Sequence, residues 1–105
     1  MHLTSYLDDG KLIIELTGEI DHHCARDYID AISGKIEAYN PKLCVLDFEN
    51  VSFMDSSGIA VIINSFRCVS GIEGRLALVA LQAQPKKIVK ASGIDKLVEI
   101  KESAV

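Results

Sequence analysis

The chain has 105 residues, of which 49% are hydrophobic, and a formal net charge of −4 at pH 7. This length suits a single domain over residues 1–105 with one hydrophobic core. The acidic balance argues against nucleic acid or an anionic membrane surface as a partner. No apolar run is long enough to span a membrane, residues 1–5 lack the features of a signal peptide, and the three cysteines are too widely spaced for a zinc or redox motif. We therefore expect a cytoplasmic protein without a metal site.

The N-terminal residues predict a β-hairpin. Apolar residues alternate over residues 12–17, which is typical of a strand with one well-buried face. The preceding Asp8-Asp9-Gly10 is a turn signal, so residues 3–7 are the expected partner strand.

A helix, a strand and a second helix follow. We expect Asp21 to cap the first helix and Asn40-Pro41 to end it. The unbroken apolar run of residues 43–46 predicts a central strand that is covered on both faces. Ser56 is the expected N-cap of the second helix, whose broad apolar stripe leaves little surface for water.

The last third of the chain predicts a strand, a helix and a final strand. Residues 76–81 form another apolar strand, and residues 97–100 form the last one. Pro85 opens the helix between them and Gly93 closes it. Strands that alternate with helices predict an α/β fold, with an antiparallel hairpin at the start and a largely parallel sheet after it.

The loop over residues 47–55 delivers Ser56 to the start of the second helix, and binding sites of such sheets lie in loops of this kind. An isolated serine there is most simply a cap. Here, however, a second serine and Gly58 follow, and Gly58 has no side chain to block approach to the helix end. Helix N-termini favour phosphate. A phosphate on Ser56 would add about −1.5 to −2 charges beside Asp55 and would repel a partner packed on this surface.

Residues 51–58, Val-Ser-Phe-Met-Asp-Ser-Ser-Gly, resemble the signature of the anti-sigma-factor antagonists, the founding members of the STAS domain family. Residues 19–23, Glu-Ile-Asp-His-His, resemble the turn before the first helix of that family, and Ser92-Gly93 resembles a Ser-Gly step after its third helix. The resemblance covers nearly the whole chain and is strongest with the sporulation members. It implies the STAS fold, a small mixed sheet of about five strands with three to four helices.

The resemblance implies a regulatory binding protein that is not an enzyme. Unphosphorylated, it would bind an anti-sigma factor that is also a serine kinase, and so release a sigma factor that controls transcription. The kinase would use ATP to phosphorylate Ser56, the serine directly after the motif aspartate, and a serine phosphatase would reverse this step. The chain itself would hold no cofactor. The residues implied in partner binding are Asp21, His22, His23, Met54, Asp55, Ser57 and Gly58.

The sequence departs from the family pattern at two places. Ala60 stands where the family often has glycine, and members commonly continue into a final helix, whereas this sequence ends at Val105. The first departure is mild. The second leaves any contact made by such a helix open.

Four rival interpretations fit parts of the sequence. A hydrolase elbow would need glycine two residues before Ser56, where Met54 stands. A metal site built from residues 22–24 is disfavoured because adjacent helix residues point in different directions. A receiver-like aspartyl phosphate on Asp47 or Asp55 lacks the acidic pair and the lysine that organise magnesium. The alternative that stays open is a STAS module of a general-stress or stress-sensing assembly, which would act as a phospho-regulated scaffold.

Overall fold

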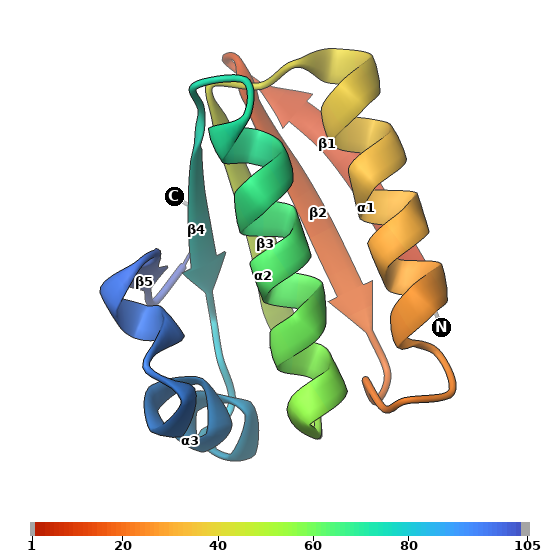
Figure 1. Ribbon diagram of the computed structural model, residues 1–105, viewed down its shortest axis with the longest axis vertical. Coiled ribbons are helices and arrows are strands. Elements are labelled where there is room, and N and C mark those ends of the chain that lie inside the picture. The colour runs from red at the N-terminus through yellow and green to blue at the C-terminus, as the bar shows by residue number, and fades with distance from the viewer. Residues whose placement is uncertain (1, 104–105) are drawn as a thin grey trace.

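A mixed β-sheet with its strands in sequence order organises the protein (Figure 1). β1 runs antiparallel to β2, and every other neighbouring pair is parallel. The computed structural model, which describes residues 2–103, gives five strands: β1 (His2–Asp8), β2 (Lys11–Thr17), β3 (Leu43–Asn50), β4 (Arg75–Val79) and β5 (Glu99–Lys101). The predicted mixed sheet with an N-terminal hairpin is confirmed.

Three α-helices and one 3₁₀ turn connect the strands within residues 2–103. Two of the helices lie side by side on one face of the sheet, and the third packs near the end where the second begins (Figure 1). This number agrees with the three to four helices expected. The helical elements are α1 (Ala25–Tyr39), α2 (Ser56–Ser70), α3 (Ala83–Ser92) and the 3₁₀ turn η1 (Ile94–Lys96).

The main core lies between the sheet and the pair α1 and α2. Alternate residues of β2 point into it, and α1 contributes a stripe at helical spacing, as the two periodicities require. Tyr28 is fully buried there, and its hydroxyl donates a 2.8 Å hydrogen bond to the Thr17 carbonyl oxygen. β3 is buried on both faces, because Val45 on the face without helices is only 3% exposed.

The first helix begins later than predicted. α1 starts at Ala25, not at Asp21. The Asp21 carboxylate accepts hydrogen bonds from the N–H groups of His23 at 2.9 Å and Cys24 at 3.3 Å. These bonds close a turn ahead of the helix, so Asp21 caps this turn. The predicted end is confirmed, because Asn40 adopts a left-handed conformation with φ of 45°.

Other boundaries shift by a few residues. β3 continues to Asn50, so the loop before α2 covers residues 51–55 only. α3 begins at Ala83, two residues before Pro85, which still lies in the first turn where a missing N–H breaks no helix bond. β4 ends at Val79, and η1 displaces the last strand to residues 99–101. Gly93 closes α3 as predicted, with φ of 80°.

No helix in the described part combines the length and the apolar character needed to cross a bilayer.

Gly74 sits where the chain turns from α2 into β4, and we expect Gly74→Ala to destabilise the fold. A Cβ there would lie 2.7 Å from both the Pro41 carbonyl oxygen and Val69 Cγ2. The free energy of unfolding in a urea titration should fall by about 1–3 kcal/mol. Gly71→Ala is the matched control, because its Cβ would meet nothing nearer than 3.4 Å, and it should change stability by less than about 0.5 kcal/mol. Equal losses in the two variants would contradict this account.

Candidate functional site

The two segments that carry the family signature are joined at the end of the sheet where α2 begins (Figure 1). Ile20 and Met54 form a parallel bridge. The Ile20 N–H donates to the Phe53 carbonyl at 3.0 Å, and the Asp55 N–H donates to the Ile20 carbonyl at 3.2 Å. The turn before α1 is therefore strapped onto the loop before α2. Residues 19–23 and 51–58, which are far apart in sequence, form one surface.

Gln84 of α3 fixes the same loop from the other side. Its Oε1 accepts a 2.9 Å hydrogen bond from the Met54 N–H, and its Nε2 donates a 2.9 Å bond to the Met54 carbonyl. Both main-chain polar groups of a buried residue are thereby satisfied. Gln84 was not predicted from the sequence. The signal was a polar side chain just beyond the carboxyl end of β4, where side chains converge on the site of the adjacent strand.

Gly58 is required for the packing of the loop against α2. Met54 is 0% exposed, and a Cβ on Gly58 would lie 2.7 Å from its sulfur and 2.9 Å from its Cβ. The first turn of α2 therefore rests directly on the Met54 side chain. The expectation that Gly58 leaves the helix end open to approach is wrong, because Met54 fills that space.

Ser56 is the first residue of α2 and not its cap. Asp55 is the N-cap, in an extended conformation, and its Oδ1 accepts a 2.8 Å hydrogen bond from the Ser57 N–H. Ser and Asp are comparable N-caps, and the carboxylate one residue earlier takes the amide. The prediction that Ser56 caps the helix is therefore wrong. Ser56 is exposed, and its hydroxyl forms no hydrogen bond with any of residues 2–103.

The histidine segment lies beside this loop. Burial acts to raise the pKa of Asp21, but hydrogen bonds from the His23 amide and from Cys24, together with the His23 charge, hold the pKa below its ordinary value. His22 and His23 are exposed, and their ring centroids lie 3.9 Å apart. No hydrogen bond in the described chain links either imidazole to Ser56. Among these residues, no three His, Cys, Asp or Glu side chains converge as metal ligands.

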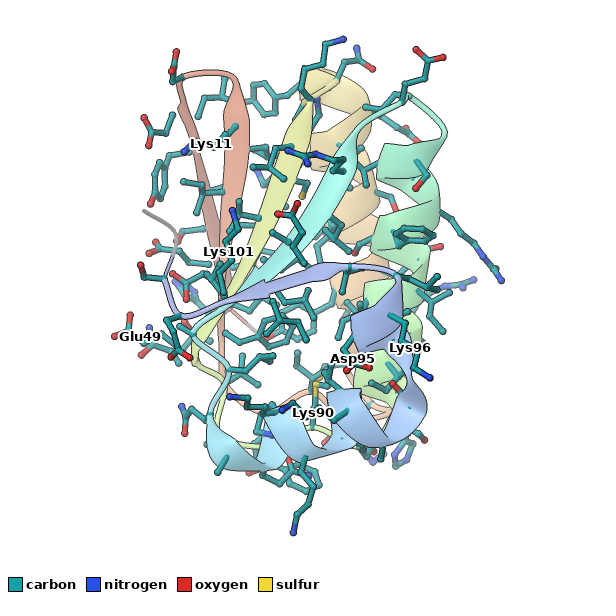
Figure 2. All side chains as sticks on the ribbon, turned by 90° about the vertical axis from the view of Figure 1, so that its left-hand side faces the viewer. Lys11, Glu49, Lys90, Asp95, Lys96 and Lys101 are labelled. Carbon is teal, nitrogen blue, oxygen red and sulfur yellow. The ribbon has the colours of Figure 1, made fainter. Side chains whose placement is uncertain are left out.

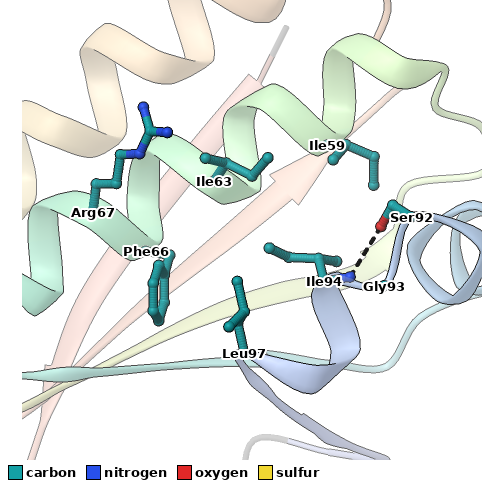
Figure 3. A pocket seen from close by; sticks show the side chains of 8 residues that line it. All are labelled: Ile59, Ile63, Phe66, Arg67, Ser92, Gly93, Ile94 and Leu97. Carbon is teal, nitrogen blue, oxygen red and sulfur yellow. Dashed lines mark hydrogen bonds between the residues drawn. The ribbon is translucent and has the colours of Figure 1, made fainter.

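The Ser-Gly step after α3 borders an apolar cavity of about 310 Å³ (Figure 3). The Ser92 hydroxyl donates to the Val89 carbonyl at 2.7 Å and accepts from the Ile94 N–H at 3.2 Å, which turns the chain from α3 into η1. The cavity lies along α2, beyond its first turn. Its apolar lining comes from α2 and from the segment after α3: Ile59, Ile63, Phe66, Ile94 and Leu97.

The mixed sheet with its N-terminal hairpin, and the strapped loop that presents a free serine at a helix start, define a small domain of the STAS type. The STAS domain model matches residues 3–104, and the chain belongs to this family. The predicted family is confirmed.

Several proteins with assigned names are similar in sequence to this chain over most of its length. It is 29% identical over 96 residues to the anti-sigma F factor antagonist of Paenibacillus polymyxa, which covers 91% of this chain and 82% of that protein. It is 28% identical over 97 residues to the anti-sigma-B factor antagonist of Listeria monocytogenes. This match covers 90% of this chain and 82% of that protein. The structure is similar to that of the Bacillus cell fate determinant SpoIIAA in its phosphorylated form, with a TM-score of 0.71 and 26% sequence identity. The similarity covers 94% of this chain and 90% of the SpoIIAA chain.

We expect Gln84→Ala to loosen the loop before α2, because it leaves the buried main-chain groups of Met54 without partners. The free energy of unfolding should fall by about 1–3 kcal/mol, and the Met54 amide should exchange faster with solvent deuterium. Gln82→Ala is the matched control. It removes a 2.7 Å bond to the carbonyl of Glu49, an exposed residue where water can replace it. A loss as large in the control would contradict a specific role for Gln84.

Proposed function

We propose that this protein is an anti-sigma factor antagonist whose partner binding is controlled by phosphorylation of Ser56. The observation that carries the proposal is the exposed hydroxyl of Ser56 at the first position of α2, with the capping role taken by Asp55. The names of the relatives support the partner class, and the similarity to a phosphorylated structure supports the modification.

Accessibility favours Ser56 over its neighbour. A kinase must bring the γ-phosphate of ATP in line with the attacking hydroxyl, so that hydroxyl has to be exposed. Ser56 is exposed, whereas Ser57 is half-buried and its N–H is held by the Asp55 carboxylate. The serine directly after the motif aspartate is also the one that the family resemblance selects.

A phosphate at Ser56 would change the charge of the surface more than it changes the fold. It would add about −1.5 to −2 charges. Asp55 would repel that charge, and the positive end of the α2 dipole would offset part of it. A partner packed on this surface would meet a new anion and would have to desolvate it. The switch therefore needs no large conformational change in this protein.

The residues implied in partner binding divide into two groups. Met54 and Gly58 are buried and hold the loop in place, so they offer no surface to a partner in this conformation. The remaining five are exposed or half-buried and would form the contact surface: Asp21, His22, His23, Asp55 and Ser57. Phe53, which is 40% exposed beside them, would add an apolar anchor to this surface.

The proposed partners follow from this role. The first is an anti-sigma factor with serine kinase activity that uses ATP, and the second is a serine phosphatase that acts on phosphorylated Ser56. The protein itself would hold no cofactor and would perform no catalysis. A second candidate keeps the same site in a STAS module of a general-stress or stress-sensing assembly, where it would act as a phospho-regulated scaffold. The named relatives antagonise anti-sigma factors of two kinds, F and B, so the site itself does not fix the circuit. Binding assays against anti-sigma factors of both circuits would separate the two candidates.

We expect Ser56→Ala to abolish phosphorylation without weakening the fold. Incubation with the cognate kinase and ATP should place phosphate on Ser56 of the wild-type protein, and mass spectrometry should find none in the variant. Because Asp55 caps the helix, the free energy of unfolding should change by less than about 0.5 kcal/mol. Ser57→Ala is the control and should still accept phosphate. Unchanged incorporation in Ser56→Ala would refute the assignment of the site.

We expect Ser56→Asp to weaken binding of the anti-sigma factor at least tenfold in calorimetry, because it places a negative charge on the contact surface. Its melting temperature should stay close to wild type, since a helix N-terminus tolerates an anion. Ser56→Asn is the matched control, with similar size and no charge, and should bind nearly as well as wild type. Wild-type affinity in Ser56→Asp, or an equal loss in Ser56→Asn, would argue against an electrostatic switch.

A further inference from the structure

The outer strand β1 has an unpaired edge without the usual protection. It pairs with β2 over its full length of seven residues, with no irregularity in register, and it contains neither proline nor lysine. Edge strands are commonly kept from pairing by short length, lysine, proline or bulges. The opposite edge has such features. β5 is three residues long, and its Glu99 is bridged to Arg75 and Lys101. Figure 2 looks onto that side, where Lys96 and Lys101 are labelled.

The hairpin geometry tells which main-chain groups of β1 face outward. Asp9 and Gly10 form a two-residue turn with φ of 52° and 82°, so the flanking Asp8 and Lys11 are a hydrogen-bonded pair. Hydrogen-bonded and non-bonded pairs alternate along an antiparallel ladder. The N–H and C=O groups of even-numbered β1 residues therefore face β2. Those of Leu3, Ser5 and Leu7 face away from the sheet.

Apolar surface gathers beside this edge. Tyr6, Leu7 and Tyr39 are 47%, 54% and 51% exposed. The other large hydrophobic side chains that are exposed in the described chain lie elsewhere: Phe53 is in the loop before α2, and Leu97 directly follows η1. The three residues border a shallow cavity of about 140 Å³, which Ser5 and Leu12 also line. An unpaired ladder and an apolar hollow thus adjoin each other.

We propose that β1 pairs with β1 of a second copy of this chain, antiparallel about a two-fold axis at Ser5. In this register Leu3 lies opposite Leu7 of the second copy, and Thr4 lies opposite Tyr6. His2 lies opposite Asp8 at both ends, which gives complementary charge when the histidine is protonated. Apolar side chains meet on the helix side of the sheet, where the cavity lies, and such cross-strand pairs stabilise a sheet.

This register is the one that the strand favours. A two-fold axis at Ser5 pairs all seven residues of β1 and makes Leu3, Ser5 and Leu7 the hydrogen-bonded positions, whose N–H and C=O groups are free. An axis at Thr4 or at Tyr6 would pair only five residues. The strand His-Leu-Thr-Ser-Tyr-Leu-Asp is thus complementary to itself when read in opposite directions.

The pairing does not involve Ser56 or the loop before α2. That residue begins α2, which packs on α1, α3 and β4, whereas β1 is joined to the sheet through β2. The proposal therefore does not depend on the proposed function. One strand pair and one small apolar contact make a limited interface, so the dimer should be weak and concentration-dependent.

Sedimentation equilibrium of the full chain up to about 1 mM tests the dimer. Ser5→Pro removes an outward N–H at the two-fold axis and leaves the bonds to β2 intact, because proline is tolerated where the N–H faces solvent. Leu7→Lys places a charge in the apolar contact. Each change should raise the Kd at least tenfold, with little change in melting temperature. Leu97→Lys, at an equally exposed leucine far along the chain, should leave the Kd unchanged.

A wild-type protein that remains monomeric throughout this range would overturn the proposal. So would a dimer that survives both Ser5→Pro and Leu7→Lys, or one that Leu97→Lys weakens equally. If circular dichroism shows that Ser5→Pro does not fold, Leu7→Lys decides alone.

Disulfide trapping tests the register. Thr4→Cys protein mixed with Tyr6→Cys protein should cross-link under mild oxidation, and each alone should cross-link little. Cys24 and Cys68 would be replaced by serine in both. Cys44 stays, because burial raises the pKa of its thiol to about 12 and keeps it unreactive. Efficient cross-linking of either variant with itself would place the two-fold axis elsewhere and overturn the proposed register.

Discussion

The contact between Met54 and Gly58 is the constraint on which the site depends. The glycine lets the first turn of α2 approach the methionine more closely than any side chain would allow. Met54 is in turn held by both amide atoms of Gln84 and by the backbone bridge to Ile20. The position of exposed Ser56, two residues away from Met54, is therefore set by residues that are buried or partly buried.

Capping the helix and receiving the phosphate are roles of two different residues in this structure. Asp55 supplies the cap, which contributes about 1 kcal/mol to a helix start. The Ser56 hydroxyl then forms no hydrogen bond in the described chain, so it can be modified without loss of the cap. A serine that both capped the helix and received the phosphate would couple signalling to stability. Separate residues avoid that coupling.

The features that sequence predicted are those decided by local chemistry. The Asp-Gly turn fixes the hairpin, and left-handed Asn40 and Gly93 end their helices. The predictions that failed concerned a choice between two good capping residues, or a contact between residues that are distant in the sequence. Asp55 and Ser56 are both good caps, so pattern alone did not decide between them. Gln84 lies 30 residues from Met54, and only the parallel arrangement of β3 and β4 shows that they meet.

The hydrogen bonds at the start of α2 also indicate where the charge of a phosphate would be directed. The N–H of Ser57 is held by the Asp55 carboxylate, and the N–H of Gly58 by the Asp55 carbonyl. At the neighbouring turn, Asp21 holds two amides in the same way. Two of the amides at the start of α2 that could bind a phosphate are thus engaged by Asp55. With these amides engaged, less of the new charge would be offset at the helix end, so more of it would face outward, toward whatever protein packs on this surface.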